Sequence, residues 1–162
     1  MYYIGIDLGT SSVKLLLVDG TGTILNEVTR EYPLEFPRPG WSQQNPEDWK
    51  KAVFTGVPQL LEGFDGRQVA GIGCGGQMHG LVVLDGEDQV IRPAILWNDG
   101  RTAREVDYLN EEIGREKLSS LTANIAFAGF TAPKLLWMRK NEPENFGKIA
   151  RIMLPKDYIN YV

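Results

Sequence analysis

Apolar residues gather in three short blocks at the start of the chain. The blocks cover residues 2–9, 13–19 and 23–36, and they are rich in Ile, Leu, Val and Tyr, which favour β-strands. A short polar turn at residues 10–12 separates the first two blocks. Asp19-Gly20 is a hairpin signal between the second and third. The pattern predicts an antiparallel meander of three strands.

Helical spacing replaces this pattern after a Pro- and Gly-containing loop at residues 36–44. Asn45 and Pro46 predict a helix start, because an Asn side chain caps free N–H groups and Pro suits the first turn. The apolar stripe that follows consists of Trp49, Val53, Val57, Leu60, Leu61 and Phe64. Gly56 and Pro58 lie within the stripe and predict a kink or an early end of the helix.

Strand and helix patterns alternate along the rest of the chain. Strands are predicted at 69–76, 81–85, 90–97 and 150–154, and helices at 101–113 and 131–141. Gly114 is expected to end the first of these helices. A meander followed by alternating helices and strands predicts an α/β domain with a mixed sheet. The length of 162 residues favours a single domain.

Composition excludes several classes of function. Hydrophobic residues make up 43% of the chain, enough for a core, and the formal net charge of −4 disfavours a nucleic-acid or membrane-surface binder. Asp7 interrupts the apolar start too early for a signal peptide, and no apolar run could cross a bilayer. One Cys and one His exclude an internal disulfide and a zinc site of these residues. We expect a soluble, cytoplasmic protein, and a homodimer is left open.

The stretch GIDLGTSS, residues 5–12, contains candidates for phosphate binding. Asp7 lies near the end of a predicted buried strand, and Gly9 and three hydroxyl residues follow it, namely Thr10, Ser11 and Ser12. Glycine lets the backbone approach a phosphate, and a carboxylate can hold hydrated Mg²⁺. An ordinary hairpin with a polar turn is the alternative. We favour function because an unpaired buried carboxylate is costly.

Two further strand ends contain groups that could bind a ligand. In AILWNDGRT, residues 94–102, Trp97 offers an apolar wall and Asp99 a hydrogen-bond acceptor, although both also suit a capped helix start. In GIGCGGQMHG, residues 71–80, Cys74 is predicted to be an inert core thiol rather than a nucleophile. The flanking glycines leave room for a ligand, so we expect His79 and Gln77 to bind hydroxyl groups.

The stretch GFTAPKLLWMRKN, residues 129–141, places Lys134 and Trp137 on a predicted helix. Its spacing agrees with a capped amphipathic helix at the surface. Nothing in the spacing alone gives a reason to prefer a functional role for either side chain.

Five stretches in this order resemble the N-terminal part of the FGGY carbohydrate kinases: IGIDLGTSSVK, GGQMHG, AILWNDGRT, GFTAPKLLWMRKN and LPKDY. QMHG and WNDGR favour the members that phosphorylate D-xylulose over those that phosphorylate glycerol. The resemblance implies the ribonuclease-H-like fold of the actin, hexokinase and Hsp70 ATPases, with ATP between two such domains. It also implies transfer of the γ-phosphoryl group of ATP to D-xylulose, which gives D-xylulose 5-phosphate.

The resemblance assigns a role to each candidate residue. Asp7 would hold Mg²⁺ and ATP; Gly9, Thr10, Ser11 and Ser12 would face the phosphates; Gln77, Met78 and His79 would contact the sugar; and Trp97 and Asp99 would line or brace the sugar pocket. The general-base Asp and the nucleotide-binding domain are expected beyond Val162. Residues 1–162 would then be an incomplete N-terminal domain without useful kinase activity alone.

Three interpretations of function remain at this point. The leading one is a xylulose-phosphorylating kinase. The second is a sister kinase of the same family that acts on ribulose, glycerol or another polyol. The third is a non-catalytic sugar-binding module that keeps the fold.

Overall fold

The first three strands form the predicted antiparallel meander. In the computed structural model, which describes residues 1–162, β1 spans Tyr2–Leu8, β2 spans Ser12–Asp19 and β3 spans Ile24–Glu31. β3 is shorter than the predicted stretch, because Pro33 lacks the N–H group that a further ladder bond needs.

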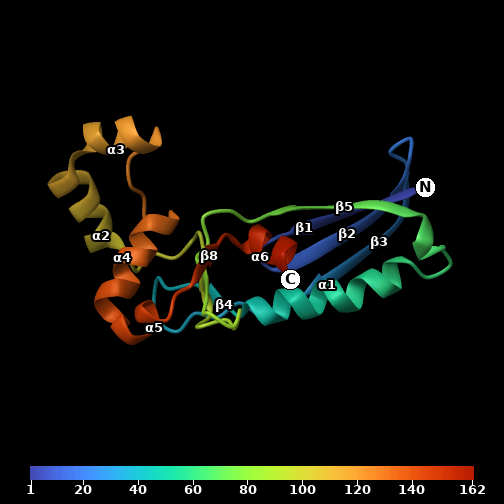
Figure 1. Ribbon diagram of the computed structural model, residues 1–162, viewed down its shortest axis with the longest axis horizontal. Coiled ribbons are helices and arrows are strands. Elements are labelled where there is room, and N and C mark those ends of the chain that lie inside the picture. The colour runs from blue at the N-terminus through green and yellow to red at the C-terminus, as the bar shows by residue number, and fades with distance from the viewer.

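A fourth strand makes the sheet mixed. β5, Val69–Gly76, pairs in parallel with β1, and the strand order is β3-β2-β1-β5. Because β1 and β5 are parallel, their carboxyl ends, Leu8 and Gly76, lie side by side at the same end of the sheet. This end of the sheet faces the helical part of the molecule (Figure 1). The predicted α/β fold with a mixed sheet is confirmed.

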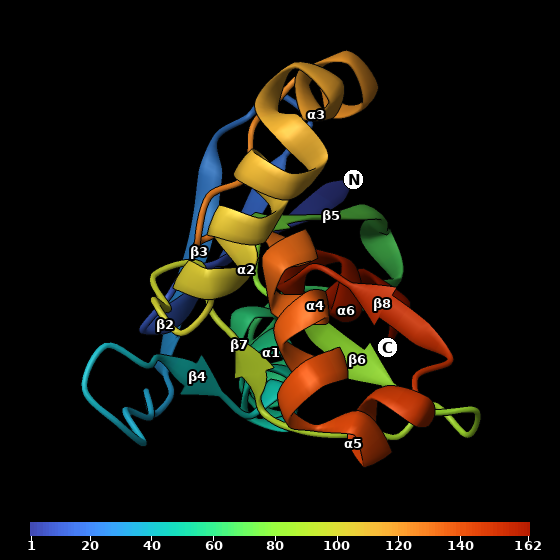
Figure 2. The ribbon, with the colours of Figure 1, turned by 90° about the vertical axis from the view of Figure 1, so that its left-hand side faces the viewer.

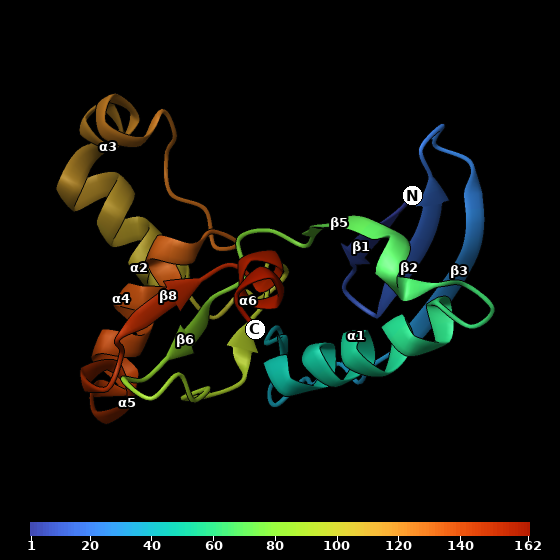
Figure 3. The same ribbon diagram turned by 45° about the vertical axis from the view of Figure 1, so that its right-hand side comes forward.

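Helix α1, Pro46–Leu60, covers one face of the sheet (Figure 3). The Asn45 side chain caps it by accepting from the Glu47 N–H at 3.2 Å. A Cβ on Gly56 would lie 2.5 Å from Leu15 Cδ1, so this glycine lets the helix approach β2 closely. The helix ends two residues after Pro58, as predicted. Buried residues between helix and sheet include Ile4, Ile6, Leu8, Val13, Leu15, Leu17, Trp49, Val53 and Leu60.

Four short strands connect the sheet to the remaining helices. β4, Gln43–Gln44, pairs with β7, Ala94–Ile95, while β6, Val82–Leu84, pairs with β8, Arg151–Met153. The predicted strands at 81–85 and 90–97 therefore pair mainly with distant segments. Only single bridges, such as Leu84 with Val90, join them to each other.

Most of the helices gather at the end of the molecule opposite the N-terminus (Figures 1 and 2). They are α2 Ala103–Asp107, a π-helical segment Tyr108–Gly114, α3 Arg115–Thr122, α4 Thr131–Asn141 and α5 Pro143–Gly147, while α6 Pro155–Tyr161 lies beside β5 and a 3₁₀ turn Gly66–Gln68 precedes that strand. Gly114 ends the predicted helix as expected, with φ of 93°. α3 was not predicted. None of the helices is long and apolar enough to span a membrane.

Candidate functional site

An open pocket of about 500 Å³ lies where β1 and β5 end. Its lining residues are Asp7, Leu8, Gly9, Thr10, Gly76, Gln77, Met78, His79 and Trp97. Three stretches that are far apart in the sequence therefore meet at one edge of the sheet. This is the position at which ligands bind in many open α/β sheets.

Asp7 lies in the pocket, but it is not buried. The alternation of β1 turns Ile6 and Leu8 into the core, so Asp7 projects from the opposite, exposed face of the sheet. The prediction of a buried carboxylate was wrong for this reason. No hydrogen bond or ion pair within the protein engages the carboxylate, so it is free to bind a ligand.

The turn after β1 presents free backbone donors. The Gly9 N–H donates to the Ser12 carbonyl at 2.9 Å and closes the turn, while the N–H groups of Thr10 and Ser11 have no acceptor within the protein. Successive free N–H groups in a tight turn suit an anion such as phosphate. The side chains of Ser11 and Ser12 do not line the pocket, since Ser12 already begins β2.

Two side chains that the sequence analysis missed hold this turn. Tyr32 donates its hydroxyl to the Gly9 carbonyl at 2.6 Å, and burial raises the pKa of that hydroxyl. Gln44, only 1% exposed, donates to the Thr10 carbonyl at 2.7 Å and accepts from Gln77 Nε2 at 3.3 Å. No local signal marks either residue, because both contacts join distant parts of the chain.

The residues after β5 bring groups suited to hydroxyls to the same pocket. The Gln77 Oε1 atom is buried without a hydrogen-bond partner, and Met78 is 55% exposed. The His79 ring stacks on Phe130 with a centroid distance of 4.5 Å, and neither ring nitrogen bonds within the protein. An acceptor and an imidazole without partners can together bind a polyhydroxy ligand.

Two of the glycines around His79, Gly76 and Gly80, make room for protein rather than for a ligand. A Cβ on Gly80 would lie 2.6 Å from Pro155 Cγ, and a Cβ on Gly76 would overlap the Leu8 backbone. Gly76 also has φ of 141°, which disfavours other residues. The expectation that these two glycines clear space for a ligand is therefore corrected.

Cys74 and His79 do not form a catalytic pair. Cys74 faces a separate cavity of about 570 Å³ between α1, β5 and α6, with Ile6 and Val53 among its mostly apolar lining residues. Burial raises the pKa of the Cys74 thiol, which opposes the thiolate that a nucleophile needs. The raised pKa agrees with the prediction of an inert thiol, but Cys74 is only partly buried and packs against the core rather than within it.

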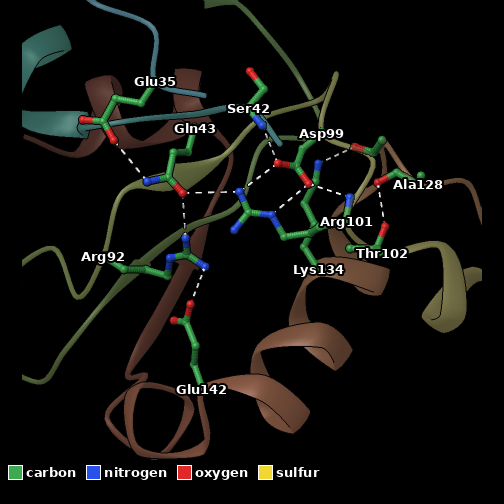
Figure 4. Close-up of polar contacts among 11 residues, drawn as sticks. Glu35, Ser42, Gln43, Arg92, Asp99, Arg101, Thr102, Ala128, Lys134 and Glu142 are labelled. Carbon is green, nitrogen blue, oxygen red and sulfur yellow. Dashed lines mark hydrogen bonds and ion pairs between the residues drawn. The ribbon is translucent and has the colours of Figure 1, made fainter. Parts of the chain in front are cut away.

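Trp97 and Asp99 have different positions. Trp97, 49% exposed, lines the pocket and donates its Nε1–H to Thr10 Oγ1 at 3.0 Å. The structure does not bring Asp99 into the pocket, because its side chain is fully buried and accepts from the Ser42 N–H at 2.6 Å. Arg101 donates to the same carboxylate through Nε and Nη2, at 2.9 and 2.8 Å (Figure 4). Asp99 therefore braces the loop and cannot contact a substrate.

Helix α4 buries part of its surface. Lys134 is fully buried and Trp137 is 8% exposed, whereas Arg139, Lys140 and Asn141 are exposed. The predicted amphipathic helix at the surface is therefore present, but the predicted cap is not, since no side chain caps its start. Burial lowers the pKa of Lys134 to about 7, while Asp99 raises it and Arg101 lowers it by smaller amounts. The Lys134 ammonium donates to the His79 carbonyl at 2.7 Å, which ties α4 to the pocket.

The pocket fits a hydrated magnesium ion better than a metal bound by protein alone. No group of three His, Cys, Asp or Glu side chains is placed to hold a metal ion. Mg²⁺ usually keeps several waters and takes one or two carboxylates together with phosphate oxygens. The free carboxylate of Asp7 beside the free N–H groups of Thr10 and Ser11 suits that arrangement.

Comparison with known proteins identifies the family. The N-terminal domain model of the FGGY family of carbohydrate kinases matches residues 2–162. The chain belongs to the FGGY family of carbohydrate kinases. This confirms the resemblance that rests on the five sequence stretches. Three of those stretches contribute residues to the pocket described above.

Several relatives of this FGGY chain cover nearly all of it. A xylulose kinase from Lactococcus lactis subsp. lactis (strain IL1403) is 45% identical over 162 residues, which are 98% of this chain and 32% of the relative. The crystal structure of a xyloylose kinase from Brucella ovis has a TM-score of 0.93 at 43% identity, over 99% of this chain and 34% of that one. A gluconate kinase from Lactobacillus acidophilus reaches 0.92 at 27% identity, over 99% and 32%. The chain spans about a third of the length of these relatives.

Proposed function

We propose that this chain is part of an ATP-dependent kinase that phosphorylates D-xylulose to D-xylulose 5-phosphate. The observation that supports this most is that one pocket brings a free carboxylate and free N–H groups together with Gln77 and His79, whose side chains have unused polar atoms. The similarity to xylulose kinases at up to 45% identity supports the choice of sugar.

The turn after β1 would serve the phosphate side of the reaction. The free N–H groups of Thr10 and Ser11 donate to phosphate oxygens, and Asp7 accepts from waters around a magnesium ion. A bound Mg²⁺ supplies positive charge against the phosphates. Tyr32 and Gln44 hold the turn in place, and positioning with charge neutralisation is most of what phosphoryl transfer requires of a protein.

The side chains after β5 would bind and orient the sugar. Gln77 Oε1 accepts from one hydroxyl group, His79 exchanges a hydrogen bond with another, and Trp97 supplies an apolar wall. The general-base Asp and a second, nucleotide-binding domain would come from outside residues 1–162. Residues 1–162 would then form part of the N-terminal domain, with ATP bound between the two domains.

A different acceptor is the second candidate. The gluconate kinase structure matches nearly the whole chain at 27% identity, so the fold and part of the pocket are compatible with another polyhydroxy substrate. Ribulose and glycerol belong to the same class of acceptors. A non-catalytic sugar-binding module is the third candidate, and it differs in having no phosphoryl transfer.

A sugar panel with the full-length protein tests all three candidates. ADP release is measured with D-xylulose, D-ribulose, glycerol and gluconate, and we expect the highest kcat/KM with D-xylulose. Asp7→Asn should lower kcat strongly, whereas Asp107→Asn, an exposed control on α2, should not. A higher kcat/KM with another acceptor would show that this acceptor, and not D-xylulose, is the substrate. Sugar binding in calorimetry without ADP release would favour the binding module.

A further inference from the structure

The backbone carbonyl of His79 is held by two side chains from the start of α4. Lys134 Nζ donates to it at 2.7 Å and Thr131 Oγ1 at 3.2 Å, and we call these two residues the carbonyl clamp. Lys134 also donates to the Gly129 carbonyl. One ammonium therefore joins the loop after β5 to the segment before α4.

Burial of Lys134 is expensive and needs a compensating role. The side chain is fully buried, so it loses its rotamer freedom and the hydration of its ammonium. Lys134 does not line the pocket, so a contact with a ligand cannot offset this free-energy cost. Figure 4 shows the side chain beside Asp99 and Arg101, which already bond to each other. Besides its attraction to Asp99, Lys134 therefore contributes the two carbonyl hydrogen bonds.

The clamp acts on a peptide that is in an unusual conformation. His79 has φ of 60°, in the left-handed region that residues with a Cβ rarely adopt. On the other side of this peptide, Gly80 packs against the Pro155 ring. With the carbonyl held on one side and Gly80 packed on the other, the imidazole is directed onto Phe130 and toward the pocket.

We propose that Lys134 is a positioning residue for the sugar side of the pocket: by holding the His79 carbonyl, it sets where the imidazole meets the sugar. The proposal rests on the proposed function, because the contact between His79 and the sugar belongs to that function. The proposal does not depend on the charge of Lys134, since a neutral amine still has two hydrogens for two carbonyls.

Steady-state kinetics of the full-length protein provide the first test. Lys134→Met keeps the volume and apolar stem but removes the donor, and we expect the sugar KM to rise about 5- to 30-fold with the ATP KM unchanged. Lys140→Met is the matched control, because Lys140 is exposed on the same helix, and it should change neither KM. Loss of kcat with both KM values unchanged would mean a purely structural role and would overturn the proposal.

A double-mutant cycle with His79→Ala tests whether Lys134 acts through His79. If it does, Lys134→Met raises the sugar KM much less in the His79→Ala background than in the wild type. Equal effects in the two backgrounds would overturn the proposal. Thr131→Val removes the other donor of the clamp with little change in shape. This variant replaces Lys134→Met in the test if Lys134→Met does not fold. We expect it to raise the sugar KM in the same direction but by less.

Hydrogen exchange tests the clamp without any activity. In Lys134→Met, the amides of residues 77–81 should exchange faster, while those of β2 keep their wild-type rates. Unchanged exchange at residues 77–81 in a folded variant would overturn the proposal. If the wild-type protein phosphorylates no sugar of the panel, the proposed function fails, and faster exchange at 77–81 would still establish the clamp as a hold on this loop.

Discussion

His79→Ala is the most direct test of the sugar side of the pocket. Both residues carry a Cβ, so the substitution does not give the left-handed backbone at φ of 60° the freedom that a glycine would give it. It removes the imidazole and its stacking on Phe130, which is 4.5 Å away. The loss of one hydrogen bond to a neutral hydroxyl costs about 0.5–1.5 kcal/mol, so kcat/KM for the sugar should fall about 2- to 13-fold.

The assay measures ADP release by the full-length protein, first with varied sugar at saturating ATP and then the reverse. We expect the sugar KM to rise and the ATP KM to stay at its wild-type value, because His79 makes no hydrogen bond to the turn that carries the free N–H groups of Thr10 and Ser11. Cys74→Ala is the control, since Cys74 faces a separate cavity. If Cys74→Ala abolished turnover and His79→Ala had no effect, the assignment would be reversed.

Three further predictions concern packing, the turn and pH. Gly80→Ala should lower the melting temperature, because the new Cβ would lie 2.6 Å from Pro155 Cγ. Gly73→Ala is the control and should not lower it, because no atom lies within 4 Å of its Cβ position. A higher melting temperature for Gly80→Ala would contradict this. Trp97→Phe should raise the ATP KM several-fold, because it removes the hydrogen bond to Thr10 in the turn proposed to bind phosphate. An unchanged ATP KM would show that this bond is unimportant. Because burial lowers the pKa of Lys134 to about 7, the unfolded state holds a proton that the folded state lacks above that pH. Wild-type stability relative to Lys134→Met should therefore rise by up to about 1.4 kcal/mol per pH unit between pH 7 and 9, measured by denaturant unfolding, and a flat difference would argue against the lowered pKa.

Elements with strong local signals could be predicted from the sequence. β1, β2 and β5 follow from their apolar runs, and the start of α1 follows from Asn45 and Pro46, whose cap is present. The short strands could not be predicted in the same way. β4 and β7 are two residues each and exist only because distant segments pair, so no periodicity reveals them. α3 has no buried residue, and an apolar stripe therefore gives no sign of it.

Predictions at the site depended on what each pattern can encode. The stretches at strand ends located the pocket, because parallel strands bring their carboxyl ends together. The burial of Asp7 was predicted wrongly, because the apolar sequence of β1 suggested a strand that is buried on both faces. In the structure only one face of β1 is buried. The burial of Lys134 was not predicted, because spacing along a helix does not show which face meets another segment.

The residues that face the pocket and the residues that hold them in place come from different parts of the chain. Trp97 reaches Thr10 across 87 positions, and Ser42 holds Asp99 across 57. The loop that carries Trp97 can keep this position because Asp99 is paired with Arg101 in the interior, where neither charge is exposed. Removing one member of such a pair leaves an uncompensated buried charge, which is far more destabilising than the pair is stabilising. The geometry of the turn after β1 therefore depends on an ion pair that lies outside the pocket.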